Sequence, residues 1–187
     1  MGEKTLNKSQ KEYLLTATEI DRILNRLVSE ILERNTDLST MVLIGMRTGG
    51  IYLAKILQRK IKKNEDIEIP IGVLDITLYR DDIGTTNQHH FVRKTEISFS
   101  LNNKDIVLVD DVLHTGRSIR AALDAMMDFG RPRTVQLAVL IDRGQRELPI
   151  RPDYVGNEIT VKKGESIEVL FDDEGKVLGA VIEKGTS

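Results

Sequence analysis

The chain has 187 residues, which is enough for one domain with a substantial buried core. Its formal net charge of −2 excludes a uniformly basic protein, so any contact with nucleic acid must come from a local patch. It contains no cysteine, which excludes disulfides and thiolate metal sites and favours a reducing, cytoplasmic compartment. The polar opening stretch MGEKTLNKSQKE has no apolar run typical of a signal peptide or a membrane span.

The first predicted elements are a helix, a strand and a second helix. Thr16 and Glu19 have the spacing of a capping box, and apolar residues then recur every three or four positions as far as Leu32. This pattern predicts an amphipathic helix with one buried face. The short apolar run MVLIG at 41–45 is typical of a buried strand, and the apolar spacing becomes helical again over 51–61.

The middle of the chain predicts further strands and one helix. Residues 69–79 are rich in Ile and predict a strand, whereas residues 80–96 show little periodicity and are typical of a functional lid or a long hairpin tip. Residues 106–110 and 135–141 predict buried strands, with a helix over 118–129 between them.

This alternation predicts an α/β fold with a mostly parallel central sheet and helices on both faces. The tail differs, because VLF, DDEG and KVLGAVI predict a closing hairpin over 161–187, part of a small subdomain at one edge of the sheet. With neither repeats nor an interdomain linker in the sequence, residues 1–187 are expected to form a single domain.

The stretch VLVDDVLHTGRS at 107–118 carries the clearest chemistry. In an open α/β sheet ligands bind beyond the carboxyl ends of the strands, where Asp110 and Asp111 are expected. The small and hydroxylated residues that follow open a helix, so their N–H groups form an anion cradle. The spacing differs from the G-x-x-x-x-G-K-[ST] loop of nucleoside triphosphatases. Two acids beside a phosphate suit vicinal hydroxyls or Mg²⁺, and a sugar phosphate offers both; alternatively, the aspartates only cap a turn.

VLVDDVLHTGRS resembles the phosphoribosyl pyrophosphate (PRPP) motif of the type I phosphoribosyltransferases. The resemblance implies that fold, and it implies that Asp110 and Asp111 contact the ribose hydroxyls and a Mg²⁺ ion held indirectly through PRPP or water. It also implies a PRPP-binding loop for the 5′-phosphate, formed by His114, Thr115, Gly116, Arg117 and Ser118.

Three more stretches resemble one branch of that family, the bifunctional pyrimidine operon regulators and uracil phosphoribosyltransferases. They are LIGMRTGGIYLA at 43–54, LDITLYRDD at 74–82 and LAVLIDRGQRELPIRPDYVG at 137–156, and the resemblance spans roughly residues 14–160. It implies a pyrophosphate-binding loop that often contains a non-proline cis peptide, with Arg80 reaching over from the lid. The residues of this loop are Met46, Arg47, Thr48 and Gly49. The alternatives are a plain strand-to-helix turn and, for Arg80, a solvated side chain.

The resemblance also implies a uracil pocket. Tyr154 would stack on or flank the base, Val155 and Val161 would hydrogen-bond it through their main chain, and Asp142 or Arg143 would reach its exocyclic oxygen. The alternative for Tyr154 is a buried tyrosine that packs the sheet edge. The family more often has Pro-Thr where this chain has Thr-Val at 160–161, so the hood over the base departs from the pattern.

His114 favours a pyrimidine substrate. Purine-salvage relatives usually carry an aspartate at this position as acid/base partner of the ring, whereas uracil has an acidic N1 that needs less help. The expected products are therefore UMP and pyrophosphate.

Family members also regulate transcription, as uridine-nucleotide sensors that bind the leader RNA of a pyrimidine operon in response to UMP or UTP. The candidate RNA-binding residues are Arg26, Arg34, Arg146 and Arg151. For the first two, the alternative is a solvated helix face of mixed charge. The resemblance further implies homodimers that assemble into tetramers or hexamers. Two functional alternatives stay open: an RNA-binding attenuator with incidental catalysis, and a phosphoribosyltransferase for another base such as hypoxanthine or orotate.

Overall fold

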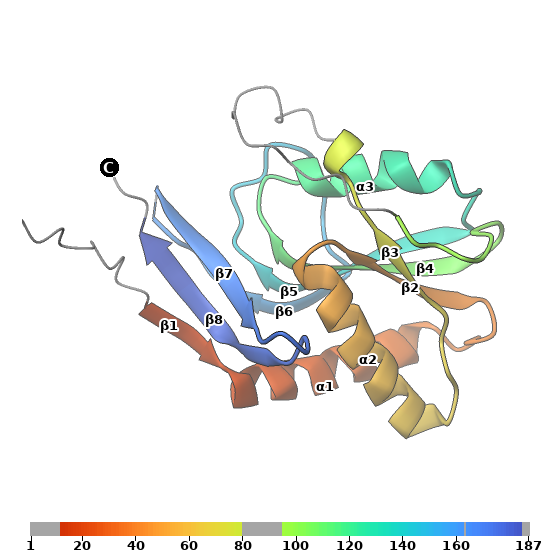
Figure 1. The fold of residues 1–187 in the computed structure, drawn as a ribbon, viewed down its shortest axis with the longest axis horizontal. Coiled ribbons are helices and arrows are strands. Elements are labelled where there is room, and N and C mark those ends of the chain that lie inside the picture. Colours follow the sequence, from red (N-terminus) through yellow and green to blue (C-terminus); the bar gives the residue numbers. More distant parts are fainter. Residues whose placement is uncertain (1–11, 80–94, 163, 185–187) are drawn as a thin grey trace, which may run out of the picture.

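The computed structural model describes residues 12–79, 95–162 and 164–184 (Figure 1). Within these residues, five parallel strands form the central sheet that the alternating sequence pattern predicts. In spatial order the strands are β3 (Ile71–Leu74), β2 (Met41–Met46), β4 (Asp105–Leu113), β5 (Thr134–Asp142) and β6 (Tyr154–Glu158). Because all five run the same way, their carboxyl ends meet at one edge of the sheet.

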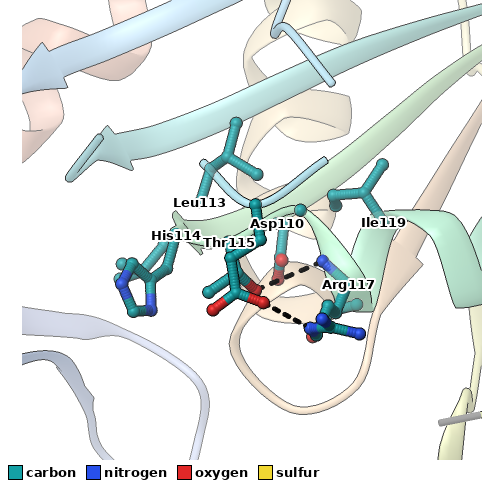
Figure 2. A pocket seen from close by; sticks show the side chains of 10 residues that line it. Asp110, Leu113, His114, Thr115, Arg117 and Ile119 are labelled. Carbon is teal, nitrogen blue, oxygen red and sulfur yellow. Dashed lines mark hydrogen bonds and ion pairs between the residues drawn. The ribbon is translucent and has the colours of Figure 1, made fainter. Parts of the chain in front are cut away.

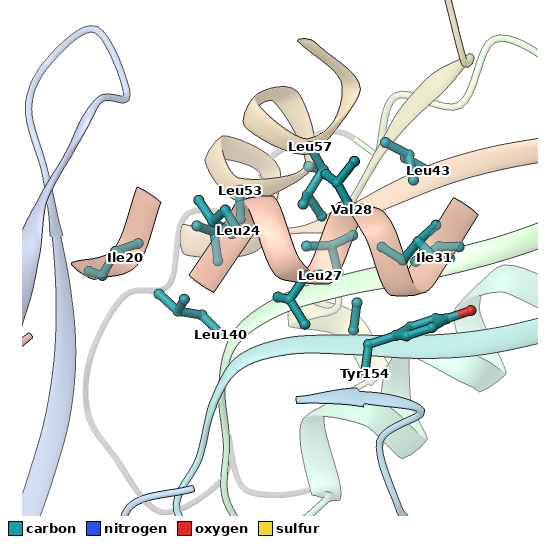
Figure 3. Packing of buried hydrophobic residues seen from close by; sticks show 14 of the residues in the cluster. Ile20, Leu24, Leu27, Val28, Ile31, Leu43, Leu53, Leu57, Leu140 and Tyr154 are labelled. Atoms are coloured by element: carbon teal, nitrogen blue, oxygen red, sulfur yellow. The ribbon is translucent and has the colours of Figure 1, made fainter. Parts of the chain in front are cut away.

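Helices cover both faces of the central sheet (Figure 1). The helices are α1 (Ala17–Arg34), α2 (Gly49–Glu65) and α3 (Arg117–Met127). One apolar cluster joins α1 and α2 to the sheet, and a second joins α3 to the opposite face. Figure 3 shows the first cluster, in which Leu24 and Val28 of α1 lie beside Leu53 and Leu57 of α2. Burial on both sides explains why β2 and β4 are continuous apolar runs.

Helix α1 begins at the predicted capping box. The Glu19 N–H donates to the Thr16 hydroxyl oxygen at 3.3 Å, and the Thr16 N–H donates to the Glu19 carboxylate at 2.8 Å. These two bonds satisfy main-chain donors that the first turn of a helix leaves without partners. The capping-box prediction is confirmed.

A second, antiparallel sheet lies beside the first in the same described part of the chain. Its strands, in spatial order, are β1 (Glu12–Thr16), β8 (Val177–Lys184) and β7 (Glu165–Phe171). The predicted closing hairpin is therefore confirmed, but its third strand, β1, was not predicted because it lies at the end of a polar stretch. The small sheet contacts α1, and β7 contacts β4, so it lies over one end of the fold.

The prediction of a strand over 69–79 is wrong for the residues after Leu74. β3 ends there, and a short 3-10 helix, η1 (Thr77–Tyr79), follows. The Asp75 carboxylate accepts from the Thr77 N–H at 2.8 Å and from the Thr77 hydroxyl at 2.5 Å. An aspartate that binds the main chain two residues on turns the chain out of the strand.

Strand β4 is longer than the predicted 106–110 and is anchored at its first residue. Asp105 is 7% exposed, and its carboxylate accepts from the hydroxyls of Thr40 and Thr134, both at 2.8 Å, and from Arg133 Nε at 2.9 Å. The Arg133 guanidinium holds the pKa of Asp105 well below its usual range. This network fixes the start of the strand that carries the two adjacent acids at its other end.

We expect Asp105→Asn to lower the free energy of unfolding at pH 7 by about 2 kcal/mol, because Arg133 and two threonine hydroxyls lose a charged acceptor. The folded-state pKa is depressed, so the stabilising contribution is present above the unfolded pKa of about 3.9 and is lost as the pH falls below it. Urea titrations of both proteins between pH 7 and pH 2.5 measure this difference. Asp124→Asn, which removes a solvent-exposed ion pair with Arg120, is the control. Curves that stayed equally separated to pH 2.5 would contradict the assignment.

Candidate active site

A cavity of about 350 Å³ opens at the carboxyl end of β4. It lies where an open parallel sheet is expected to bind a ligand. Figure 2 shows Asp110 on the strand, His114 and Thr115 on the loop before α3, and Arg117 at the start of α3. The lining residues are Asp110, Val112, Leu113, His114, Thr115, Gly116, Arg117, Ser118, Ile119 and Glu147. Six of the seven residues predicted to bind PRPP are in this set.

Asp110 and Asp111 lie inside strand β4, close to its carboxyl end at Leu113. The Asp111 N–H donates to Asp110 Oδ1 at 3.0 Å, and the Val112 N–H donates to Asp111 Oδ1 at 2.9 Å. Burial raises the pKa of both carboxyls, and the negative charge of Asp111 raises the pKa of Asp110 further. A buried pair of like charges is stabilised by a cation or by hydroxyl donors, which is what a metal-bound sugar supplies.

The loop between β4 and α3 has the geometry of an anion cradle. Gly116 adopts φ = 90° immediately before α3, a conformation that favours glycine, and the Arg117 N–H donates to the Thr115 hydroxyl at 3.3 Å. N–H groups at the start of the helix therefore gather beside small side chains. Arg117 Nε donates to the Glu147 carboxylate at 2.6 Å, a contact that Figure 2 marks with a dashed line.

The loop between β2 and α2 reaches the acid pair. The Arg47–Thr48 peptide is cis, as the resemblance implies, and the Arg47 N–H donates to Leu74 O at 3.0 Å. A Cβ on Gly49 would lie 2.1 Å from Asp111 Oδ2, and one on Gly50 would lie 2.2 Å from the carbonyl oxygen of Val109. Only glycines permit this approach, so two motifs separated by 60 residues in the sequence are in contact at one edge of the sheet.

Arg47 and Met46 differ in what they offer to a ligand. Arg47 Nη2 donates to the Glu96 carboxylate at 3.0 Å. The Met46 side chain is only 1% exposed and packs in the cluster below α3, so it can contribute its main chain alone. Thr48 and Gly49 continue into α2. Arg80 and most of the lid predicted over 80–96, namely residues 80–94, lie outside the described residues.

The prediction that Tyr154 flanks the base is wrong, and the buried alternative is what the structure shows. Tyr154 begins β6, two strands from β4 and in register with Val109, and it is 3% exposed because its side chain packs in the cluster with α1. Its hydroxyl donates to Gln136 Oε1 at 2.6 Å and accepts from Asn35 Nδ2 at 3.1 Å. Figure 3 shows its ring beside α1 in the apolar cluster. The Tyr154 hydroxyl needs buried partners, and Asn35 and Gln136 supply them.

Val155 lies in register with Asp110, two strands away in the central sheet. Its carbonyl oxygen accepts from Arg26 Nη2 at 3.1 Å, and its side chain packs with the cluster that includes α3. The carbonyl oxygen and the side chain of Val155 therefore both have partners within the chain.

The other base-pocket candidates form a connected group above β4. The Arg143 N–H donates to Leu113 O at 3.0 Å, and Arg143 Nη2 donates to the carbonyl oxygen of Glu165 at 3.1 Å. Gln145 Nε2 donates to Val161 O at 3.4 Å, and Gln145 Oε1 lies 3.3 Å from His114 Nε2. These bonds link the PRPP-binding loop to Val161 and to the start of β7 in the small sheet.

Three of the four candidate RNA-binding arginines make contacts within the chain. Arg26 pairs with Glu30 at 2.6 Å and donates to the carbonyls of Val155 and Gly156. Arg34 pairs with Asp153 at 2.7 Å. These two therefore agree with the alternative of a helix face of mixed charge.

Arg146 holds the loop after β5 together. Its guanidinium donates to His114 O at 2.7 Å and to Ile150 O at 3.1 Å, and it pairs with Asp142 at 2.5 Å. Arg146 and Asp142, predicted for RNA and for the base, therefore bind each other in this structure. Arg151 is exposed.

Sequence reasoning missed three polar residues of the site: Glu96, Gln145 and Glu147. Gln145 and Glu147 lie inside the stretch QREL that supported the resemblance, so their place in that stretch could have marked them as site residues. Glu96 follows the undescribed segment, and only its pairing with β3 brings it back to the site. Among the described residues no three acidic or histidine side chains gather as a metal site, and no helix there has the length and apolarity to cross a bilayer.

Comparisons with known proteins show the family of the chain. The family model described as "Phosphoribosyl transferase domain" matches residues 10–172, so the chain belongs to the phosphoribosyl transferase family. A relative named "Bifunctional protein PyrR" from Geobacter sp. (strain M21) is 48% identical over 171 residues, covering 91% of this chain and 97% of the relative. One of the same name from Enterococcus faecalis (strain ATCC 47077 / OG1RF) is 47% identical over 175 residues, covering 94% and 98%. Within the family, the chain therefore belongs with the bifunctional PyrR proteins.

Solved structures show the same fold at low sequence identity. A hypoxanthine phosphoribosyltransferase from Trypanosoma cruzi has a TM-score of 0.73 at 18% identity and covers 94% of this chain and 96% of its own. One from Staphylococcus aureus has a TM-score of 0.66 at 21% identity, with coverages of 88% and 85%. The type I phosphoribosyltransferase fold is thereby confirmed.

Proposed function

We propose that the protein transfers the 5-phosphoribosyl group of PRPP to uracil and forms UMP and pyrophosphate. The observation that carries the proposal is the contact of the Arg47–Gly49 loop with the acid pair, beside the Thr115–Ser118 loop that continues from the same strand. PRPP carries a ribose between a 5′-phosphate and a 1-pyrophosphate. Each of its three parts therefore has a separate group of residues suited to it.

The acid pair also fits Mg²⁺. Carboxylate oxygens are hard ligands of the kind this ion takes, and the two buried carboxyls, with raised pKa values, are stabilised by a nearby cation. Asp110 and Asp111 would hold it, with water and ligand oxygens completing the coordination. Bound there, the ion would neutralise charge on the pyrophosphate.

The residues of the chain have distinct roles in the transfer. Asp110 and Asp111 hold the ribose hydroxyls, and the loop N–H groups with Arg117 fix the 5′-phosphate. Arg47 and the main chain beside it stabilise the charge that develops on the departing pyrophosphate. The bond between C1 and the pyrophosphate oxygen breaks, the bond from C1 to N1 of uracil forms, and the N1 proton is released.

A base panel tests the substrate. Purified protein with PRPP and Mg²⁺ is given uracil, hypoxanthine, guanine or orotate, and nucleotide is separated and quantified. We expect UMP to form much faster than any other nucleotide, because His114 faces the amide of Gln145 and not a carboxylate. Conversion of hypoxanthine or orotate without formation of UMP would show that the base assignment is wrong.

A second function is favoured by the shared name of the relatives, "Bifunctional". We infer UMP-dependent binding to the leader RNA of a pyrimidine operon, with exposed Arg151 as the candidate phosphate contact. Filter binding with and without UMP, across a salt series, tests it. We expect binding to weaken steeply with salt and Arg151→Ala to reduce the slope by about one. Binding that ignores UMP would contradict a nucleotide-sensing regulator.

A further inference from the structure

Each arginine of the two anion-binding loops is ion-paired with a glutamate from elsewhere in the chain. Arg47 Nη2 lies 3.0 Å from Glu96 Oε1, and Arg117 Nε lies 2.6 Å from Glu147 Oε2. Glu147 also lines the cavity at the carboxyl end of β4, together with Ser118 and Asp110. A carboxylate in a cavity suited to phosphate is a like charge that requires an explanation.

Both glutamates have an anchored main chain and a side chain in contact with water. The Glu96 N–H donates to Val73 O at 2.8 Å, and the Val73 N–H donates back to Glu96 O at 2.9 Å. The Glu147 N–H donates to Thr115 O at 3.0 Å. The side chains are 62% and 51% exposed, so each carboxylate can rotate into solvent while its main chain stays in place.

A phosphate group that binds either arginine meets the carboxylate already there. Two anions side by side repel each other, and an exposed ion pair is weak enough to be exchanged for a phosphate with several charges. Displacing the glutamate from its arginine costs the same free energy for every ligand that places a phosphate at that arginine. It therefore changes binding rather than the chemical step.

We propose that Glu96 and Glu147 are exchangeable internal counter-ions, one for each end of the ligand. Each holds its arginine in the ligand-free protein and is displaced when phosphate binds, which weakens binding of substrate and product alike and favours product release. Glu147 acts at the 5′-phosphate and Glu96 at the pyrophosphate. The assignment of the two ends rests on the proposed function.

Binding measurements on two variants give a crossed pattern. Titration calorimetry of Glu147→Gln with UMP, Mg-pyrophosphate and Mg-PRPP should show about two- to fivefold tighter binding of UMP and PRPP and unchanged binding of pyrophosphate. Glu96→Gln should tighten pyrophosphate and PRPP by a similar factor and leave UMP unchanged. Both effects should shrink at high salt.

Glu68→Gln is the matched control. Glu68 follows the carboxyl end of α2 and forms an exposed ion pair with Lys62 in the last turn of that helix. It makes the same change of net charge away from both loops and should leave all three affinities unchanged. Equal shifts in all three variants would show a general charge effect and overturn the proposal, as would weaker binding in Glu96→Gln and Glu147→Gln. Wild-type protein that bound neither UMP nor PRPP would instead overturn the proposed function, and this inference with it.

Discussion

The double substitution Asp110→Asn/Asp111→Asn is expected to lower kcat for UMP formation by about a hundred- to a thousandfold. It should at the same time stabilise the ligand-free protein. Activity falls because the ribose hydroxyls and the metal environment lose both negative charges. Stability rises because asparagine keeps the shape and still accepts from the Asp111 and Val112 N–H positions, but it carries no buried charge.

The stabilisation by this substitution depends on pH in a defined direction. Burial raises the folded-state pKa of both carboxyls above their unfolded values, so ionisation disfavours the folded state. Well below the unfolded pKa of about 3.9 both states of the wild type are protonated, and the two proteins should be equally stable. As the pH rises through the raised pKa values the wild type loses stability. At pH 8 the free energy of unfolding of the variant should exceed that of the wild type by about 1 kcal/mol or more.

Thermal unfolding without ligand, from pH 2.5 to pH 8, measures this difference, and steady-state kinetics measure the loss of activity. The low-pH limit is an internal control for any change in packing. A variant less stable than the wild type at pH 8 would contradict the electrostatic account of the pair. A variant that retained kcat would remove Asp110 and Asp111 from the site.

The second large effect is expected at the approach of α2 to β4. Gly50→Ala would place a Cβ 2.2 Å from the carbonyl oxygen of Val109, a main-chain atom that cannot rotate away. We expect a loss of about 3 kcal/mol in the free energy of unfolding, because α2 must shift away from the strand. That shift also separates the Arg47–Gly49 loop from Asp111, so UMP formation should fall with it.

Gly164→Ala serves as the comparison for Gly50→Ala. Gly164 has φ = 90° and no atom within 4 Å of a built Cβ, so alanine there meets only the left-handed strain of about 1–2 kcal/mol. Denaturant unfolding of both variants separates the two causes. A Gly50→Ala protein no less stable than Gly164→Ala would show that the close approach is not required.

Local patterns explain what could be predicted from the sequence. Buried parallel strands are continuous apolar runs, so β2, β4 and β5 were evident, and the capping box at Thr16 marked the start of α1. The residues around Asp110 and Gly116 could be assigned to a site because the two acids, the end of the strand and the start of the helix follow one another closely in the sequence.

The failures come from contacts between distant residues. Tyr154 was assigned to the base from the resemblance, and no local pattern showed that its side chain packs against α1. Its partner Asn35 is 119 residues away. The ion pairs of Arg47 and Arg117 join residues 49 and 30 positions apart, and no spacing rule connects them.

The most direct test of the central claim is to follow PRPP by ³¹P NMR in the presence of wild-type protein, Mg²⁺ and uracil. The account predicts that PRPP signals are replaced by those of UMP and pyrophosphate in equal amounts, and that little changes when uracil is omitted. PRPP that persists with uracil present, or that yields ribose 5-phosphate without UMP, would contradict it.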